Sequence, residues 1–249
     1  MRPPKRPNPR ESVVGAAYCR GVFGHGPFAR GSGRLGTMAA RLAGGNGALA
    51  LLCNTLPTGA ILTVLILTFG PISGAHFNPA VSTAMALRGE LAARSTATYI
   101  GAQVIGGVIG VLAAHLMFEL PVWQVSATAR TGPGQWFAEA VATFGLLLTI
   151  IGCSARTPSA VPYAVGLYIT AAYWFTASTS FANPAVTIAR SLSDTFAGIA
   201  PAGVIAFIAA QFVGMFAAVA LSRWLWRDES SQRGISSLAA DRRPGPSPK

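Results

Sequence analysis

The sequence is poor in charge: charged residues make up 11% of its 249 residues, whereas a soluble domain usually has about a quarter. Its mean hydropathy is +0.47, which excludes an ordinary soluble protein. Most basic residues gather near the two ends, from Arg2 to Arg41 and from Arg223 to Lys249. Basic ends can bind nucleic acid, but beside membrane segments they are the usual flanking charge. We therefore predict a multi-pass protein that contacts a lipid bilayer and binds no nucleic acid.

Cysteine and histidine are also scarce. The cysteines have no paired spacing, so neither a disulfide framework nor a metal site is expected at Cys19, Cys53 and Cys153. The histidines form no zinc-ligand cluster, being scattered at His25, His76 and His115. No nucleophile and base share a plausible helix register, which argues against an enzyme. We expect no catalytic residues, no metal and no cofactor.

One short phrase occurs twice in the chain. It reads Asn-Pro-Ala, first at Asn78, Pro79 and Ala80 and again at Asn183, Pro184 and Ala185. Asparagine is a good helix cap, and proline suits the first helical position because its missing N–H costs nothing there. The apolar runs that follow are too short to span a bilayer. Because each lies between membrane-length segments, we predict two half-helices that dip into the membrane and meet.

Two facing half-helix starts have an electrostatic consequence. Each helix N-terminus carries partial positive charge and unpaired N–H donors, so a pair of them at mid-membrane repels cations. The side-chain amides of Asn78 and Asn183 can offer N–H groups to a neutral solute that passes between them. This pairing of half-helix dipoles is a known way to admit neutral molecules and exclude protons.

The paired motifs in two hydrophobic halves resemble the major intrinsic protein (aquaporin) family, over roughly residues 44–226. The resemblance implies an all-α membrane protein with an aquaporin-like inverted repeat and two re-entrant half-helices. It also implies a passive channel for small neutral solutes, assembled as a homotetramer with one pore per subunit. The alternatives are a secondary transporter of small solutes, which can also contain inverted repeats, and a non-conducting truncated family member.

The hydrophobic spans reveal an irregularity in the repeat. Asn183 follows Asn78 by 105 positions, and Gln211 follows Gln103 by 108. We expect five full spans, near residues 47–70, 96–118, 135–153, 161–177 and 201–224, whereas the family has six. The second half has a helix with the family's Glu-xxx-Thr-xx-Leu signature, at residues 139–146, but the first half shows no counterpart. The first transmembrane helix is therefore predicted to be missing or altered.

The ends of the chain are assigned by composition. Residues 1–43 are interpreted as a basic leader, disordered or mistranslated, with a frameshift or mistaken start upstream of Met38 as the simplest cause. Residues 44–228 form the predicted channel domain, and residues 229–249 are interpreted as a disordered tail.

The resemblance also implies a selectivity constriction. The family usually has arginine three residues after the second motif's asparagine, and this chain has Val186, which predicts a wider and less polar narrow point. Counting along the spans adds Thr58 and a residue among 171–173, of which we choose Tyr173. Ser180, on the loop before Asn183, is a further candidate, although it could be an ordinary turn residue.

Three more residues are predicted to support the pore. Arg190, one helical turn after Val186, either lines the outer vestibule or is a solvated helix end. His76 is interpreted as loop packing or pore lining rather than a titrating switch. Glu139 is an acid inside an apolar run, which is costly and usually functional or paired. In the family it holds a buried loop backbone in place, and we favour that structural role over a proton relay.

The segment after the second motif, residues 185–194, resembles a bacterial subgroup of these channels associated with arsenic resistance. That similarity implies arsenite or a comparable neutral metalloid hydroxide as solute, beside polyols and possibly water. It also implies a location in the bacterial inner membrane.

Overall fold

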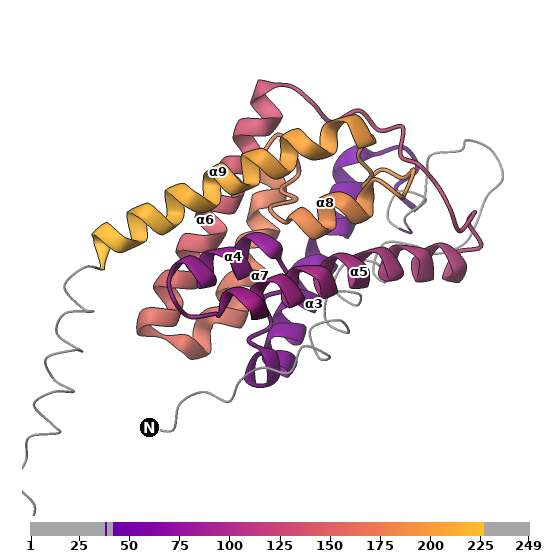
Figure 1. The fold of residues 1–249 in the computed structure, drawn as a ribbon. Coiled ribbons are helices and arrows are strands. Elements are labelled where there is room, and N and C mark those ends of the chain that lie inside the picture. Colours follow the sequence, from indigo (N-terminus) through magenta and orange to yellow (C-terminus); the bar gives the residue numbers. More distant parts are fainter. Residues whose placement is uncertain (1–37, 39–41, 227–249) are drawn as a thin grey trace, which may run out of the picture.

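The computed structural model describes residue 38 and residues 42–226, and within them every regular element is a helix (Figure 1). Five helices are long: α3 (Gly47–Ser73), α5 (Ala93–Met117), α6 (Pro133–Arg156), α7 (Val161–Phe175) and α9 (Pro201–Leu225). Two are short, α4 (Pro79–Leu87) and α8 (Pro184–Arg190), and Figure 1 shows them among the long ones. The all-α fold with two half-helices is therefore confirmed.

The length of α7 differs from the prediction. Among the described residues, four helices are long and apolar enough to cross a membrane, namely α3, α5, α6 and α9. Helix α7 lies where the fourth full span was expected, but it has only 15 residues and is preceded by a 3-10 turn at Pro158–Ala160. The expected bounds were 161–177, so this helix is two residues shorter than predicted, and all five long helices lie where spans were expected. The helix ends early because Thr176 leaves the helical conformation and starts the second re-entrant loop.

The two halves of the chain interlock. Helices α3, α4 and α5 are followed in the same order by α7, α8 and α9, with α6 ahead of the second set. Each half-helix touches elements of both halves: α4 packs against α5, α6 and α9, and α8 packs against α5 and α9. The half-helices also contact each other. The centre of the bundle is therefore built jointly by both copies.

Helices α3 and α7 cross at two glycines. A Cβ on Gly166 would collide with Thr63 Oγ1 and would lie 2.7 Å from Gly59 O. A Cβ on Gly59 would collide with Thr170 Oγ1 and would lie 2.8 Å from Gly166 O. Only glycine at both positions lets the two backbones approach this closely. This crossing fixes α7 beside the first re-entrant loop.

The predictions for the leader and tail fall mostly outside the described residues. Of the leader 1–43, only Met38, Leu42 and Ala43 are described, and none of the tail 229–249 is. The expected loss or alteration of the first transmembrane helix falls on the same leader and stays a prediction.

Candidate functional site

The two re-entrant loops share an unusual backbone. In the first, Ala75 and Phe77 have φ of 47°, and in the second, Ser180 and Ala182 have φ of 49° and 47°. Left-handed backbone costs a non-glycine residue roughly 1–2 kcal/mol, so it persists only where the surroundings hold it. The same alternation before each asparagine shows that the loops are two copies of one structure.

The two asparagines tie these loops together. The backbone N–H of Ala80 donates to Asn78 Oδ1 (2.9 Å), and that of Ala185 donates to Asn183 Oδ1 (3.0 Å). Each side chain therefore caps its own half-helix, as predicted. Each Nδ2 then donates to the opposite loop: Asn78 to Ala182 O (2.7 Å) and Asn183 to Phe77 O (2.8 Å). Since an amide has two N–H groups, each asparagine keeps a second donor.

Both asparagines line a cavity of about 230 Å³. A single water needs at least about 10–15 Å³, so the cavity accommodates a larger solute. One part of the lining is residues 74–78, and another wall is apolar. The apolar wall is contributed chiefly by Leu62, Ile66, Leu146, Val165 and Ile169. A small solute in this space meets both hydrogen-bonding groups, among them those of Asn78 and Asn183, and hydrocarbon.

The cavity has two distinct ends. Glu90 and Ser154 lie at the first end, beside the C-terminus of α4, which we call the α4 end. The lining continues through Asn78 and Asn183 to Val186, towards the C-terminus of α8, which we call the α8 end.

Glu139 on α6 holds the second loop. Its Oε1 accepts from Phe181 N and its Oε2 from Ala182 N, both at 2.8 Å, and Gln211 Nε2 donates to Oε2 at 2.6 Å. The carboxylate is fully buried. Charge-assisted hydrogen bonds of this kind stabilise a buried carboxylate and fix the backbone that it binds. These contacts support the structural role predicted for Glu139, which stays a prediction.

The first loop has a related set of contacts. Gln103 Nε2 donates to Ser82 Oγ (2.9 Å), as Gln211 Nε2 does to Thr187 Oγ1 (2.9 Å) in the second half. His76 Nδ1 lies 3.1 Å from the same Ser82 Oγ, and its ring packs 5.5 Å from that of Tyr99. His76 also lines the cavity, so the two alternatives predicted for it, loop packing and pore lining, do not exclude each other.

The four predicted constriction residues are placed differently. Val186 lines the cavity, whereas Thr58, Tyr173 and Ser180 are buried without lining it. Thr58 Oγ1 donates to Asn54 O within its own helix (2.7 Å). Ser180 is fully buried, and its Oγ has no hydrogen-bond partner among the described residues.

Two arginines gather near the α8 end. Arg190 Nη2 donates to Tyr173 Oη (3.2 Å), and its Cζ lies 4.4 Å from the ring centre of Phe181. Arg130, from the loop between α5 and α6, has its Cζ 5.1 Å from the same ring centre. Its guanidinium donates to the oxygens of four residues, namely Ser178, Thr179, Phe196 and Gly198. Burial lowers the pKa of Arg130 to about 10, and Arg190 adds to the lowering, so Arg130 remains charged at neutral pH.

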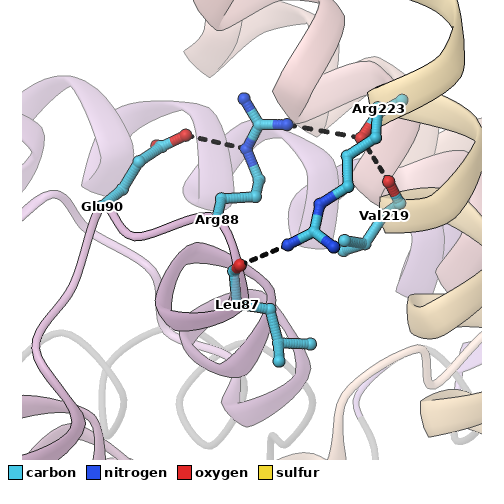
Figure 2. Close-up of polar contacts among 6 residues, drawn as sticks. Leu87, Arg88, Glu90, Val219 and Arg223 are labelled. Atoms are coloured by element: carbon cyan, nitrogen blue, oxygen red, sulfur yellow. Dashed lines mark hydrogen bonds and ion pairs between the residues drawn. The ribbon is translucent and has the colours of Figure 1, made fainter.

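At the α4 end, two arginines join α4 to α9 (Figure 2). Arg223 donates to Leu87 O, the last residue of α4, at 2.6 Å. Arg88 donates to Ser222 Oγ (3.3 Å) and forms an ion pair with Glu90 (2.7 Å). Figure 2 shows Arg88 and Arg223 lying side by side between the two helices. Cations beside a helix C-terminus are favourable, so this contact stabilises the position of the half-helix.

The comparison with known proteins identifies the family to which the chain belongs. The model of the major intrinsic protein family matches residues 35–160. The aquaglyceroporin AqpS of Rhizobium meliloti (strain 1021) is 57% identical over 178 residues, which cover 72% of this chain and 76% of the relative. The chain belongs to the major intrinsic protein family.

Other members of the family agree. The glycerol uptake facilitator protein-like 6 of Lactiplantibacillus plantarum is 30% identical over 66% of this chain and 78% of its own length. The solved aquaglyceroporin of Plasmodium falciparum superposes with a TM-score of 0.60 at 18% identity, covering 88% of this chain and 93% of that one. At that identity the structural match shows the fold alone. The chain is accordingly a multi-pass membrane channel protein.

Sequence reasoning in terms of this family missed two features. Arg130 lies on a loop that is far in sequence from either Asn-Pro-Ala motif. Only the presence of a charge in a charge-poor chain could have indicated that this residue has a role near the site. Arg223 was interpreted as flanking charge beside a membrane segment, but its side chain binds the half-helix α4. Both contacts join segments that are distant in sequence, which no local pattern reports.

Proposed function

We propose that this major intrinsic protein conducts small, uncharged, hydroxyl-bearing solutes down their gradients, with glycerol-like polyols and arsenite as cargo and water as a lesser one. The observation that carries the proposal is the pairing of Asn78 and Asn183 at one cavity. Each has one N–H tied to the opposite loop and a second one left to meet a solute oxygen. The identity with a relative named an aquaglyceroporin supports the polyol assignment.

The chemistry of Glu139 favours a channel over a coupled transporter. A transporter driven by an ion gradient needs an ionisable group that binds and releases the ion. Glu139 is the acid inside α6, and its carboxylate already accepts three hydrogen bonds from the protein. It is therefore engaged in holding the loop, which leaves it poorly suited to ion coupling.

The orientation and assembly belong to the same proposal. Arg88, Arg156 and Arg223 lie near the helix ends at the α4 end, whereas the α8 end has Arg130 and Arg190, both turned into the protein. Positive flanking charge favours the cytoplasm, so the α4 end faces inward across the bacterial inner membrane. We also propose a homotetramer with one pore per subunit, on the basis of family membership.

The test is solute flux into vesicles that contain the purified full chain. We expect glycerol and arsenous acid to enter in proportion to their gradients, with no effect of an uncoupler, and protein-free vesicles to stay tight. Asn183→Asp keeps the capping oxygen but replaces the N–H donors with negative charge. Glycerol flux should then fall roughly tenfold, because a lost hydrogen bond is worth about 1–2 kcal/mol.

A matched control is Asn46→Asp. Asn46 caps α3 in the same way, accepting from Ala48 N and Leu49 N, but it is exposed and lies outside the cavity. The glycerol flux of the Asn46→Asp variant should equal that of the unmodified chain. Glycerol entry that collapses with the uncoupler, or an equal loss in both variants, would contradict the proposal.

A further inference from the structure

We propose that Arg190 and Tyr173 together form the polar wall of the selectivity constriction at the α8 end, in place of the charge that Val186 removes. The inference rests on the proposed solute channel and assigns the residues that set its specificity. Arg190 acts from one helical turn beyond the position where the family usually has its arginine.

The positions of both residues follow from the cavity lining. On α7, Val161, Val165 and Ile169 line the cavity at intervals of four residues, and Tyr173 is the next position on that face. On α8, Val186 lines the cavity, and Arg190 is the next position on its face. Both side chains therefore lie directly beyond the point where the cavity ends.

The two side chains meet there. Arg190 Nη2 donates to Tyr173 Oη at 3.2 Å, so a hydrogen bond joins α7 to α8 just past Val186. Tyr173 is 1% exposed, and Arg190 is partly buried. This contact lies directly beyond the last lining residue, Val186, and is the narrow point of the proposed path.

Neighbouring groups hold the Arg190 guanidinium in place. It lies over Phe181, whose backbone N–H is bound by Glu139 and whose ring packs 5.5 Å from that of Phe207. Arg130 approaches the same ring and is fixed by its own acceptors, so repulsion between the two guanidinium groups limits where that of Arg190 can move. A cation over an aromatic ring is itself favourable by about 0.5–2 kcal/mol.

The fixed guanidinium has donors to offer. It carries five N–H groups, and among the described residues one hydrogen bond, that to Tyr173, is formed by its side chain. A neutral solute with several oxygens can accept from the rest while its carbon side contacts Val186. A cation meets repulsion at the same place. The constriction therefore selects polyhydroxylated neutral solutes over cations, and over water, which gains less from several donors.

The experiment measures three permeabilities in vesicles that contain the full chain: glycerol, water and methylammonium. For Arg190→Ala we expect the glycerol-to-water ratio to fall at least fivefold and methylammonium entry to rise at least fivefold. Arg190→Lys keeps the charge, so it should still exclude methylammonium while lowering the ratio about twofold to threefold. Tyr173→Phe removes the hydrogen bond to the Arg190 guanidinium but keeps its charge. This variant should therefore change the glycerol-to-water ratio and still exclude methylammonium.

Arg94→Gln is the matched control, because Arg94 is an exposed arginine on the first turn of α5, close to the α4 end. Its three permeabilities should equal those of the unmodified chain. If Arg190→Ala does not fold, the Lys and Phe variants decide the question. This inference alone is overturned if the unmodified chain passes glycerol, but all Arg190 and Tyr173 variants keep the same glycerol-to-water ratio and still exclude methylammonium. An unmodified chain that does not pass glycerol overturns the proposed function instead.

Discussion

Glu139 shows how much one buried side chain can determine about a loop. The second re-entrant loop turns through left-handed backbone at Thr179, Ser180 and Ala182, a conformation that these residues do not favour. The Glu139 carboxylate binds the N–H groups of two residues within that turn and takes a third hydrogen bond from Gln211. The loop keeps its shape because its backbone N–H donors bind the Glu139 carboxylate, which is buried and held in place.

Glu139→Gln is predicted to destabilise the protein. The amide keeps one good acceptor but turns an NH₂ group towards backbone donors, which leaves at least one buried N–H unpaired. The cost should be about 3 kcal/mol, or a fall in Tm of roughly 6–12 °C for a chain of this size. Thermal unfolding in detergent micelles measures it.

Glu119→Gln serves as its control, since Glu119 is exposed on the loop after α5. It removes the same charge and should leave Tm unchanged. An unchanged Tm in Glu139→Gln as well would mean that the loop holds its shape by other contacts.

At the scale of elements, the crossing of α3 and α7 depends on the absence of side chains. Gly59 and Gly166 face each other, and each is bordered by a threonine of the other helix. In a membrane, helices gain most from close van der Waals contact, so small residues at a crossing contribute more than large apolar ones. The same crossing places Val165 and Ile169 of α7 against the cavity.

Gly166→Val should therefore separate these helices. Its side chain has no free space, and overpacking of this kind typically costs about 1–3 kcal/mol. We expect a lower Tm and a lower yield of monodisperse protein, both seen by size-exclusion chromatography after heating. Gly101→Ala is the counterpart, since Gly101 on α5 has no heavy atom within 4 Å of a built Cβ. It should be neutral or slightly stabilising, because alanine favours a helix by about 1 kcal/mol over glycine.

At the scale of the molecule, the sequence predicted the features that repeat or that follow from local patterns. The paired Asn-Pro motifs predicted the half-helix starts, because capping is a local property of the chain. The sequence-based prediction overestimated the length of α7, because hydropathy does not show that Thr176 leaves the helix to form a loop. The contacts of Arg130 and Arg223 could not be predicted, because they join segments separated by 48–136 positions.

The molecule as a whole should have a defined orientation. Helix α9 ends at the α4 end, where Arg223 binds Leu87 O, so a reporter fused after Trp226 should lie in the cytoplasm. A green fluorescent protein fusion there should be bright, and an alkaline phosphatase fusion should be inactive. Fusions in the loop between α5 and α6 should give the reverse. A bright signal from both sites would contradict the orientation.

The crosswise bonds of the two asparagines have one more consequence. Each amide depends for its acceptor on a carbonyl in the other copy of the motif. A single copy would leave that amide without a partner deep in hydrocarbon, where an orphaned polar group costs several kcal/mol. One repeat alone therefore does not form a pore with half the activity. The pore forms only when both repeats are docked against each other.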